Sequence, residues 1–369
     1  MHRFLFTNTS FEEELISPLD SPIEFLQKYP IHLHLHYLSC LVADEIETPL
    51  LYLAPDDDYL KRLETLGLFC NPPAFLNSNN LHSEKSSLHS FGASESLALW
   101  AQKNRCLYEI PPLELVKKIN SKEFSFYEGP KLKEAEILLT EAELSSWWKK
   151  VKGPKVLKTL HGFSGRGHFI SKWDGEDLEA ALSFFRATKK FSKGLLAEPW
   201  VDRVLDFSSQ WDIQKNGSYS YLGSTICLNS PRGVYRKSFT GLDSVLFQEH
   251  LDFFKEHLFH AEKAVKKIAL LGFFGNLGFD AMLYRSSDSK DIKVHPIVEI
   301  NARKTMGWVA LKIHKKLQWE EPMSFSFEMK KTRAPSYLPL YALTHQGAHI
   351  PFKAQLLIEK KKDLISLLS

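Results

Sequence analysis

The sequence has little of what marks secreted, membrane-spanning or disulfide-rich proteins. Its 369 residues include only four widely spread cysteines, with no C-x-x-C pair and no obvious disulfide framework, so a reduced, cytoplasmic setting is expected. The longest apolar runs, such as residues 268–275, are far shorter than the roughly 20 residues of a membrane-spanning helix. The first residues become polar too soon for a signal peptide, so we expect none.

Strong charge of one sign is also missing. The formal net charge is +3, from 47 basic and 44 acidic residues that are interspersed along the chain. This balance favours neither a nucleic-acid-binding protein nor a membrane-surface protein, and no nucleic-acid-binding motif is found. A hydrophobic content of 44% with 25% charged residues is typical of a globular protein, and the length predicts about two to three domains.

The first 115 residues are predicted to form an α/β domain. Strand-like runs at residues 3–6, 31–38 and 50–54 alternate with helical stretches, of which residues 56–66 end at Gly67. Residues 77–90, rich in Ser, Asn and His, are expected to be a surface loop. Pro111 and Pro112 then mark a domain junction.

Three further parts follow: residues 116–195, 196–325 and a tail at 326–369. The first is a second α/β unit, with helices at 113–119 and 141–151, strands at 135–139, 155–158 and 168–171, and a helix after Asp174. The next contains a hairpin turning at Asn216-Gly217, a long amphipathic helix ending at Gly272, and strands at 277–284 and 292–300. The tail has strand-like runs but no functional motif.

The most informative stretch is His295-Pro-Ile-Val-Glu-Ile-Asn-Ala-Arg303. Glu299, Asn301 and Arg303 occupy alternate positions of an expected strand, so they should project together, with Val298, Ile300 and Ala302 on the other face. A carboxylate, an amide oxygen and a guanidinium on one strip suit a divalent metal, the phosphates that it bridges and an anionic reactant. We therefore expect the chemistry here.

A glycine-rich loop is the second informative feature. Lys158 precedes it, and Gly162, Gly165 and Gly167 allow backbone N–H groups to approach an anion closely. Because a strand rather than a helix is expected after the loop, it is not a dinucleotide fingerprint. A strand, a glycine loop and a strand describe a hairpin lid over phosphates, although the loop alone is equally compatible with a plain turn.

Four ordered blocks across residues 115–315 resemble the ATP-grasp superfamily. They are Asn120-Ser-Lys122, Lys158 with its glycine loop, Leu196-Ala-Glu198-Pro-Trp-Val201, and Gly278-Phe-Asp280-Ala-Met with Glu299-Ile-Asn301-Ala-Arg303. The resemblance implies an α/β and α+β architecture in which two α+β lobes enclose ATP. It also implies that residues 1–115 form a smaller, Rossmann-like domain preceding a central subdomain and a C-terminal lobe.

The resemblance also implies roles for individual residues. Magnesium, as one or two ions for which Mn²⁺ is an alternative, would bind Asp280, Glu299 and Asn301. The catalytic residues would be Arg303, which holds the γ-phosphate or the substrate carboxylate, together with Lys158 and Arg236. ATP would be bound by a larger set: Lys122, Lys158, Gly162, Ser164, Gly165, Arg166, Gly167, Glu198, Trp200, Val201 and Asp206.

The typical reaction of this family joins a carboxylate to an amine through an acylphosphate and releases ADP and phosphate. The expected partners are therefore small-molecule carboxylates and amines, such as amino acids or a peptide, and neither nucleic acid nor a membrane; a homodimer is left open. Two alternatives remain at this point: a kinase-like member that stops at phosphoryl transfer, and an ATP-binding module without turnover.

Each assignment has a plainer interpretation that the sequence leaves open. Asp280 and Glu299 would also fit a surface salt-bridge network, Lys122 a solvated lysine, and Glu198 the flank of a structural turn. Arg236, in the loop that begins near Ser230, would fit a solvent-facing position as well as an anionic substrate. Finally, His32, His34 and His36 alternate on the expected strand 31–38, where the polar face of a strand is favoured over a zinc site.

Overall fold

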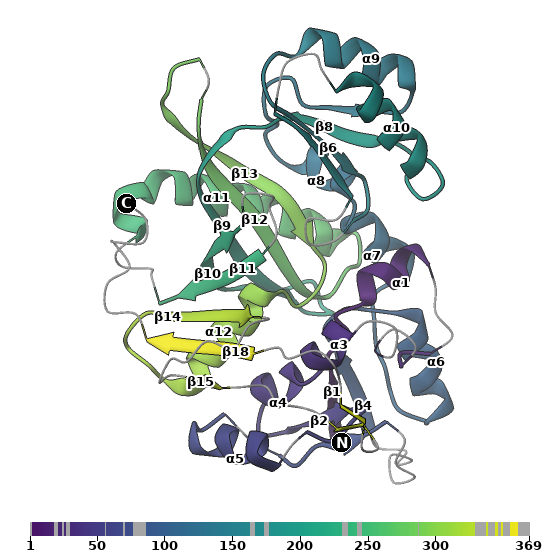
Figure 1. The fold of residues 1–369 in the computed structure, drawn as a ribbon. Coiled ribbons are helices and arrows are strands. Elements are labelled where there is room, and N and C mark those ends of the chain that lie inside the picture. Colours follow the sequence, from purple (N-terminus) through teal and green to yellow (C-terminus); the bar gives the residue numbers. More distant parts are fainter. Residues whose placement is uncertain are drawn as a thin grey trace.

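The computed structural model describes most of the chain, with interruptions. The described residues are 2–17, 21–23, 26, 30–55, 57–68, 71–76, 86–162, 167–172, 177–230, 235–241, 246–286, 288–328, 337–338, 344–345, 348–349 and 355–360. The described residues form three larger sheets and one two-stranded sheet, and the larger sheets are accompanied by helices (Figure 1). No helix within these ranges has the length and apolarity needed to cross a bilayer.

The first sheet is parallel, with strand order β3-β2-β1-β4, and the strand-helix alternation predicted for this region is confirmed. Leu50, Phe4, Phe6 and Leu88 fill its core. Its strands and helices are β1 (His2–Phe6), α1 (Phe11–Ile16), α3 (Pro30–Leu35), α4 (Leu38–Val42), β2 (Glu47–Leu51), α5 (Asp57–Thr65), β3 (Ala74–Phe75), β4 (Ser86–Ser90) and α6 (Glu95–Lys103).

Two predictions for this domain are wrong. The expected strand 31–38 is helical, in α3 and α4, because Pro30 begins a helix, where its fixed φ and missing N–H are tolerated. His32, His34 and His36 are therefore buried residues of a helix and its end, not the face of a strand. The expected loop 77–90 ends in strand β4, whose Ser86 and Ser87 are buried, so small polar residues concealed the strand; residues 77–85 lie outside the described ranges.

The second sheet is antiparallel, with order β5-β8-β6-β7, and α9 and α10 cover one of its faces (Figure 1). Its elements are β5 (Glu136–Leu138), α9 (Glu141–Lys150), β6 (Lys155–Thr159), β7 (His168–Ser171), α10 (Leu178–Thr188) and β8 (Leu195–Pro199). Helix α9 starts with a capping box in which Thr140 and Glu143 bond reciprocally. Helices α7 (Leu113–Ile119) and α8 (Lys122–Glu128) precede this sheet, and α8 was not predicted.

The third sheet has eight strands in the order β13-β12-β9-β10-β11-β14-β18-β15. The predicted hairpin is confirmed: β9 (Asp202–Ile213) and β10 (Tyr219–Asn229) flank Gly217, whose φ is +82°. The other elements are β11 (Tyr235–Thr240), α11 (Leu246–Leu270), β12 (Gly275–Arg285), β13 (Ile292–Asn301), α12 (Met306–Leu317), β14 (Met323–Glu328), β15 (Tyr337–Leu338) and β18 (Gln355–Lys360). A separate small hairpin is formed by β16 (Thr344–His345) and β17 (Ala348–His349).

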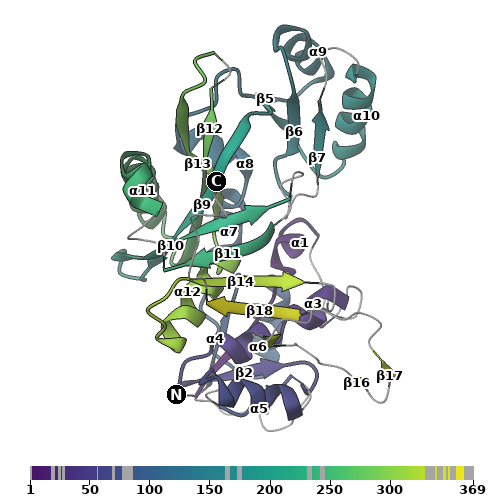
Figure 2. The same cartoon turned by 60° about the vertical axis from the view of Figure 1, so that its left-hand side comes forward.

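Helices on this sheet connect it to its neighbours. Figure 2 shows α11 along one side of the sheet, where Val265 and Ile268 are buried against β13 residues such as Ile300. Helix α12 lies between the sheet and the first domain, since Val309 and Ile313 share a core with residues of α4. The expected domain boundaries at 195/196 and 325/326 fall within β8 and β14, so strand pairing continues across both.

Candidate functional site

The polar strip predicted from the sequence is formed by the adjacent strands β12 and β13. Asp280 pairs with Glu299 in the strand register, and Gly278 pairs with Asn301. The Asn301 amide donates to Oδ2 of Asp280 at 3.1 Å, and Nη2 of Arg303 donates to Oδ1 of Asn301 at 3.0 Å. The strip thus brings together the two carboxylates, the amide and the guanidinium.

The other face of β13 differs in one detail from the prediction. Ile300 and Ala302 are buried in the core against α11, as expected, but Ile297 rather than Val298 is the third core residue. The register between β12 and β13 shifts after Asp280, so that Met282 pairs with His295. Such a bulge changes the face to which the side chains before Glu299 point. The prediction assumed strict alternation from Val298 to Arg303 and therefore placed Val298 in the core.

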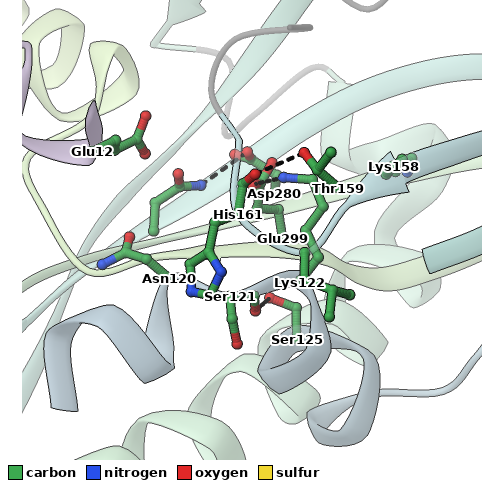
Figure 3. Close-up of polar contacts among 12 residues, drawn as sticks. Glu12, Asn120, Ser121, Lys122, Ser125, Lys158, Thr159, His161, Asp280 and Glu299 are labelled. Carbon is green, nitrogen blue, oxygen red and sulfur yellow. Dashed lines mark hydrogen bonds and ion pairs between the residues drawn. The ribbon is translucent and has the colours of Figure 1, made fainter. Parts of the chain in front are cut away.

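Both candidate phosphate-binding lysines are buried and paired with carboxylates. Lys122, the first residue of α8, places Nζ 2.5 Å from Oε1 of Glu299, and its side chain is 6% exposed. Lys158 on β6 places Nζ 2.6 Å from Oε2 of Glu198 on β8. A buried, ion-paired Lys122 excludes the plainer interpretation of this residue as a solvated lysine. Figure 3 shows Lys122 directed towards Glu299, beside Asp280.

Local structure holds these lysines in place. Ser121 caps α8 by accepting a hydrogen bond from the backbone N–H of Phe124, and the backbone N–H of Lys122 donates to Leu160 at the start of the glycine loop. Asn120 accepts from the backbone N–H of Ala302, which links the start of α8 to the end of β13. The short segment 120–122 therefore connects the lid sheet (β5-β8-β6-β7) to the acidic strip, which consists of Asp280, Glu299, Asn301 and Arg303.

The ionisation of the carboxylates follows from these contacts. Burial alone would raise the pKa of Glu198 and of Glu299, but Lys158 with His295 lowers the first and Lys122 lowers the second below its ordinary value. Asp280 has no such lysine. Burial and the neighbouring Glu299 raise its pKa from 3.8 to about 7. Asp280 is therefore the carboxylate of this strip whose negative charge is not fully balanced by neighbouring cations.

The donor set of this strip fits a magnesium ion. Magnesium takes oxygen ligands and is usually held by one or two carboxylates plus substrate phosphates. Asp280 and Glu299 supply two carboxylates and Asn301 an amide oxygen, and a cation there would offset the charge that raises the Asp280 pKa. Within the described residues, no group of three or more His, Cys, Asp or Glu side chains is arranged to hold a metal ion. His32, His34 and His36 therefore form no such group.

The segment between β8 and β9 carries two predicted nucleotide contacts, Trp200 and Val201, and Asp206 follows within β9. The backbone N–H of Trp200 donates to the Pro154 carbonyl at 2.8 Å, so an adenine contact at Trp200 would have to use its carbonyl oxygen, while Val201 follows directly. The guanidinium of Arg203 lies over the Trp200 ring, 5.1 Å from its centroid, and also pairs with Asp206 at 3.2 Å. Asp206 accepts a second bond from Asn229.

The glycine loop has the predicted strand-loop-strand context, between β6 and β7. Gly167 has φ +77°, and a Cβ there would lie 2.6 Å from Oγ1 of Thr159, so both backbone conformation and space require glycine. Gly162 lies at the other end of the loop, directly after His161, whose carbonyl accepts a hydrogen bond from the Thr159 hydroxyl. The predicted contacts at Ser164, Gly165 and Arg166 lie outside the described residues.

One predicted catalytic residue lies apart from this set. Arg236 is an exposed residue of β11, which pairs with β10 and β14. Among the described residues, no contact joins Arg236 to the acidic strip or to the lysines. Its catalytic assignment therefore remains a prediction without support from this geometry.

Three residues of the site were not predicted. His168 lies opposite Lys158 in the β6–β7 pair, and burial together with Lys158 and Lys122 lowers its pKa to about 4. His295 lies 4.0 Å from Glu198. Glu12 of the first domain pairs with Arg303 at 2.9 Å. The position of His168 opposite Lys158 could have been predicted from the hairpin around the glycine loop. The role of Glu12 could not, because Glu12 is 291 positions from its partner Arg303.

Solved structures provide the comparison that decides the fold. The chain superposes on the biotin carboxylase domain of 2-oxoglutarate carboxylase from Hydrogenobacter thermophilus, solved with MgADP, ADP and bicarbonate, with a TM-score of 0.56 at 13% identity, covering 98% of this chain and 86% of that one. Biotin carboxylase from Campylobacter jejuni gives a TM-score of 0.58 at 12% identity, covering 97% and 87% of the two chains. The chain has the ATP-grasp fold.

A second type of enzyme shares this ATP-grasp arrangement. N5-carboxyaminoimidazole synthetase from Staphylococcus aureus, solved with ADP, superposes with a TM-score of 0.55 at 10% identity, covering 99% of this chain and 95% of that one. No family model matches the sequence, and no curated protein matches it either. The predicted fold class is confirmed, while identities of 10–13% establish the fold alone.

Proposed function

We propose that this protein is an ATP-dependent ligase that activates a carboxylate as an acylphosphate and transfers the acyl group to an amine, releasing ADP and phosphate. The observation that carries this proposal is the strip of Asp280, Glu299, Asn301 and Arg303 facing the buried Lys122. Phosphoryl transfer depends on positioning and on neutralising charge, and this strip offers both without a nucleophilic side chain of the protein.

ATP would lie between the lid sheet and the eight-stranded sheet, with its phosphates between Lys158 and the acidic strip. Both lysines hold carboxylates in this structure, so phosphate oxygens would replace Glu299 on Lys122 and Glu198 on Lys158. At Glu299 such an exchange keeps the buried charge compensated, because magnesium would neutralise the carboxylate that Lys122 leaves. The hinge at Trp200 and Val201 would contact the adenine.

Asp280, Glu299 and Asn301 would hold magnesium, which would supply positive charge to offset the charge that develops during transfer. Arg303 would bind and orient the substrate carboxylate. A carboxylate oxygen then attacks the γ-phosphorus, the bond to the bridging oxygen breaks, and ADP leaves. The amine attacks the acyl carbon, loses a proton, and inorganic phosphate leaves with the C–O bonding electrons. The lid would protect the acylphosphate from water.

The comparisons support this reaction class. The three enzymes that share the fold were solved with MgADP, ADP and bicarbonate, as a beta-gamma-ATP complex, and with ADP. They support a small carboxylate or bicarbonate as the first acyl substrate to test and ATP as the phosphoryl donor. The acyl and amine substrates are to be identified by screening, because substrate specificity resides in side chains that differ between proteins of one fold.

The test is ADP release screened against pairs of carboxylates, including bicarbonate, and amines, with magnesium. For an active pair, the carboxylate is labelled with ¹⁸O. An acylphosphate route transfers one labelled oxygen to inorganic phosphate for each amide formed. A stable phosphorylated product without amide would replace the ligase with a kinase, and nucleotide binding without turnover in any pair would leave only a binding module.

A further inference from the structure

The first domain contributes a carboxylate directly to the proposed site. Oε1 of Glu12, in α1, accepts a hydrogen bond from Nε of Arg303 at 2.9 Å, and the two side chains are 16% and 22% exposed. The Arg303 guanidinium also lies 5.9 Å from the centroid of the Phe11 ring. Figure 3 shows Glu12 on the purple N-terminal ribbon, across the site from Lys158. Two consecutive residues of α1 thus contact the same guanidinium.

The nitrogen atoms of the Arg303 guanidinium bond to residues of two different domains. Nε bonds to Glu12 of the first domain, whereas Nη2 bonds to Asn301 of the acidic strip. Because a guanidinium is planar, bonds at these two nitrogens fix both its plane and its rotation. Burial alone would lower the Arg303 pKa, but Glu12, Asp280 and Glu299 raise it above its ordinary value, so the group stays charged.

The supporting structure is built around the carboxyl ends of β1 and β4, where the strand order of the first sheet reverses. Ligands of open α/β sheets commonly bind at such a point. Here Asn8 fills it: its Oδ1 accepts from the backbone N–H groups of Phe91 and Gly92, and its Nδ2 donates to the Gly92 carbonyl. A Cβ on Gly92 would lie 2.4 Å from the Phe11 ring, so the two loops are in close contact.

The end of β4 and the residue that follows it also bind Lys304, the residue after Arg303. The backbone N–H of Lys304 donates to the Phe91 carbonyl at 2.8 Å, and its Nζ donates to the Ser90 carbonyl at 2.7 Å. The ring of Phe91 packs edge-on against Trp308, with centroids 5.8 Å apart. Residues 303 and 304 therefore contact the first domain at four places, and the bond between Lys304 N–H and the Phe91 carbonyl joins backbone groups alone.

We propose that Glu12 is a positioning residue that orients Arg303 for the reacting carboxylate, and that the switch point of the first domain serves as the support for this arginine instead of binding a nucleotide. The inference rests on the proposed ligase function. A misplaced guanidinium would weaken binding of the reacting anion and the transition state, while leaving the nucleotide contacts at Lys158 and the hinge intact.

The experiment compares the wild-type protein with Glu12→Gln, Glu12→Asp and the matched control Glu95→Gln, which removes an exposed carboxylate from the first turn of α6 in the same domain. For the active substrate pair, Glu12→Gln should lower kcat/KM for the carboxylate by about tenfold or more, with KM for ATP within about twofold of wild type. Glu12→Asp should recover part of the loss, and Glu95→Gln should match wild type. MgADP affinity, measured by calorimetry on the same preparations, should be equal in all four.

Two outcomes would overturn the inference separately from the function. If Glu12→Gln retains full kcat/KM in an active enzyme, Glu12 does not position Arg303, and the ligase assignment stands. If kcat/KM for the carboxylate and KM for ATP worsen together, and Glu12→Asp recovers nothing, the residue supports the domain interface in general. A wild-type protein that binds MgADP but turns over no pair removes both the ligase assignment and this role for Glu12.

Discussion

Nζ of Lys122 lies 2.5 Å from Oε1 of Glu299, although the two residues are 177 positions apart in the chain. One comes from the start of a helix beside the lid sheet and the other from the last long strand of the eight-stranded sheet. Their contact joins the two halves between which ATP would bind. The contact also means that a carboxylate of the protein itself balances the positive charge of Lys122 in the proposed site.

Glu299→Gln removes the charge of one proposed magnesium ligand while keeping the side-chain shape. ADP release should fall by about 100-fold or more, because the metal that offsets phosphate charge in the transition state would lose one of its carboxylate ligands. Glu136→Gln, which removes a half-exposed carboxylate from β5, is the matched control and should retain activity. Unchanged ADP release in Glu299→Gln, measured with the active pair, would refute the metal assignment.

Lys158 and Glu198 form a buried pair, so their substitutions should not be additive. Lys158→Met and Glu198→Gln should each lower the free energy of unfolding by about 3 kcal/mol, since each leaves a buried group without its partner. The double variant should lose less than the sum by roughly 1–3 kcal/mol. Urea unfolding of all four proteins gives the coupling, with the exposed Arg186–Glu141 pair as a control that should be additive. Additivity at 158 and 198 would contradict the pairing.

His257 predicts a specific pH dependence of stability. This buried histidine bonds to the Pro296 carbonyl and to Ser209, and burial lowers its pKa from 6.5 to about 4. The unfolded chain therefore binds more protons between these pH values, so stability is present above pH 6.5 and is lost as the pH falls towards 4. The contribution is roughly 3 kcal/mol. Urea unfolding from pH 7 to 4 should show a shallower slope in His257→Gln; an equal slope would contradict the assignment.

Gly307 in the first turn of α12 should resist substitution by alanine, which elsewhere in a helix stabilises by about 1 kcal/mol. A Cβ at this position would lie 2.8 Å from Nε2 of Gln210 and 2.9 Å from Oγ1 of Thr225. These atoms belong to a buried hydrogen-bonded network that includes Ser208, the register partner of Asp280. Gly307→Ala should therefore lower the free energy of unfolding by about 1–3 kcal/mol. A gain in stability would show that the network yields easily.

Much of the fold was predictable because local patterns and burial agree. The helices 113–119 and 141–151, the hairpin at Gly217 and the strands around the glycine loop were all predicted within a few residues. The alternation in 299–303 also predicted which side chains gather. These features depend on interactions between near neighbours in the sequence, which a pattern can represent.

The remainder depends on contacts between distant segments. The pattern 31–38 alternates as a strand would, but all three of its histidines are buried, and Pro30 begins a helix. The pairing of Lys122 with Glu299 and of Glu12 with Arg303 requires knowledge of how the domains pack. The bulge after Asp280 shifts the register between β12 and β13. Strict alternation therefore wrongly placed Val298 among the core residues, where Ile297 lies instead.

In the proposed site, a nucleotide's phosphates and a divalent ion occupy the space between Lys122, Lys158 and the acidic strip. The decisive experiment is a crystal structure with Mn²⁺ and a non-hydrolysable ATP analogue, in which the anomalous signal of manganese locates the ion. We expect an anomalous peak ligated by the carboxylates of Asp280 and Glu299, with phosphate oxygens on Lys122 and Lys158. Nucleotide bound elsewhere, or manganese absent from these carboxylates, would contradict it.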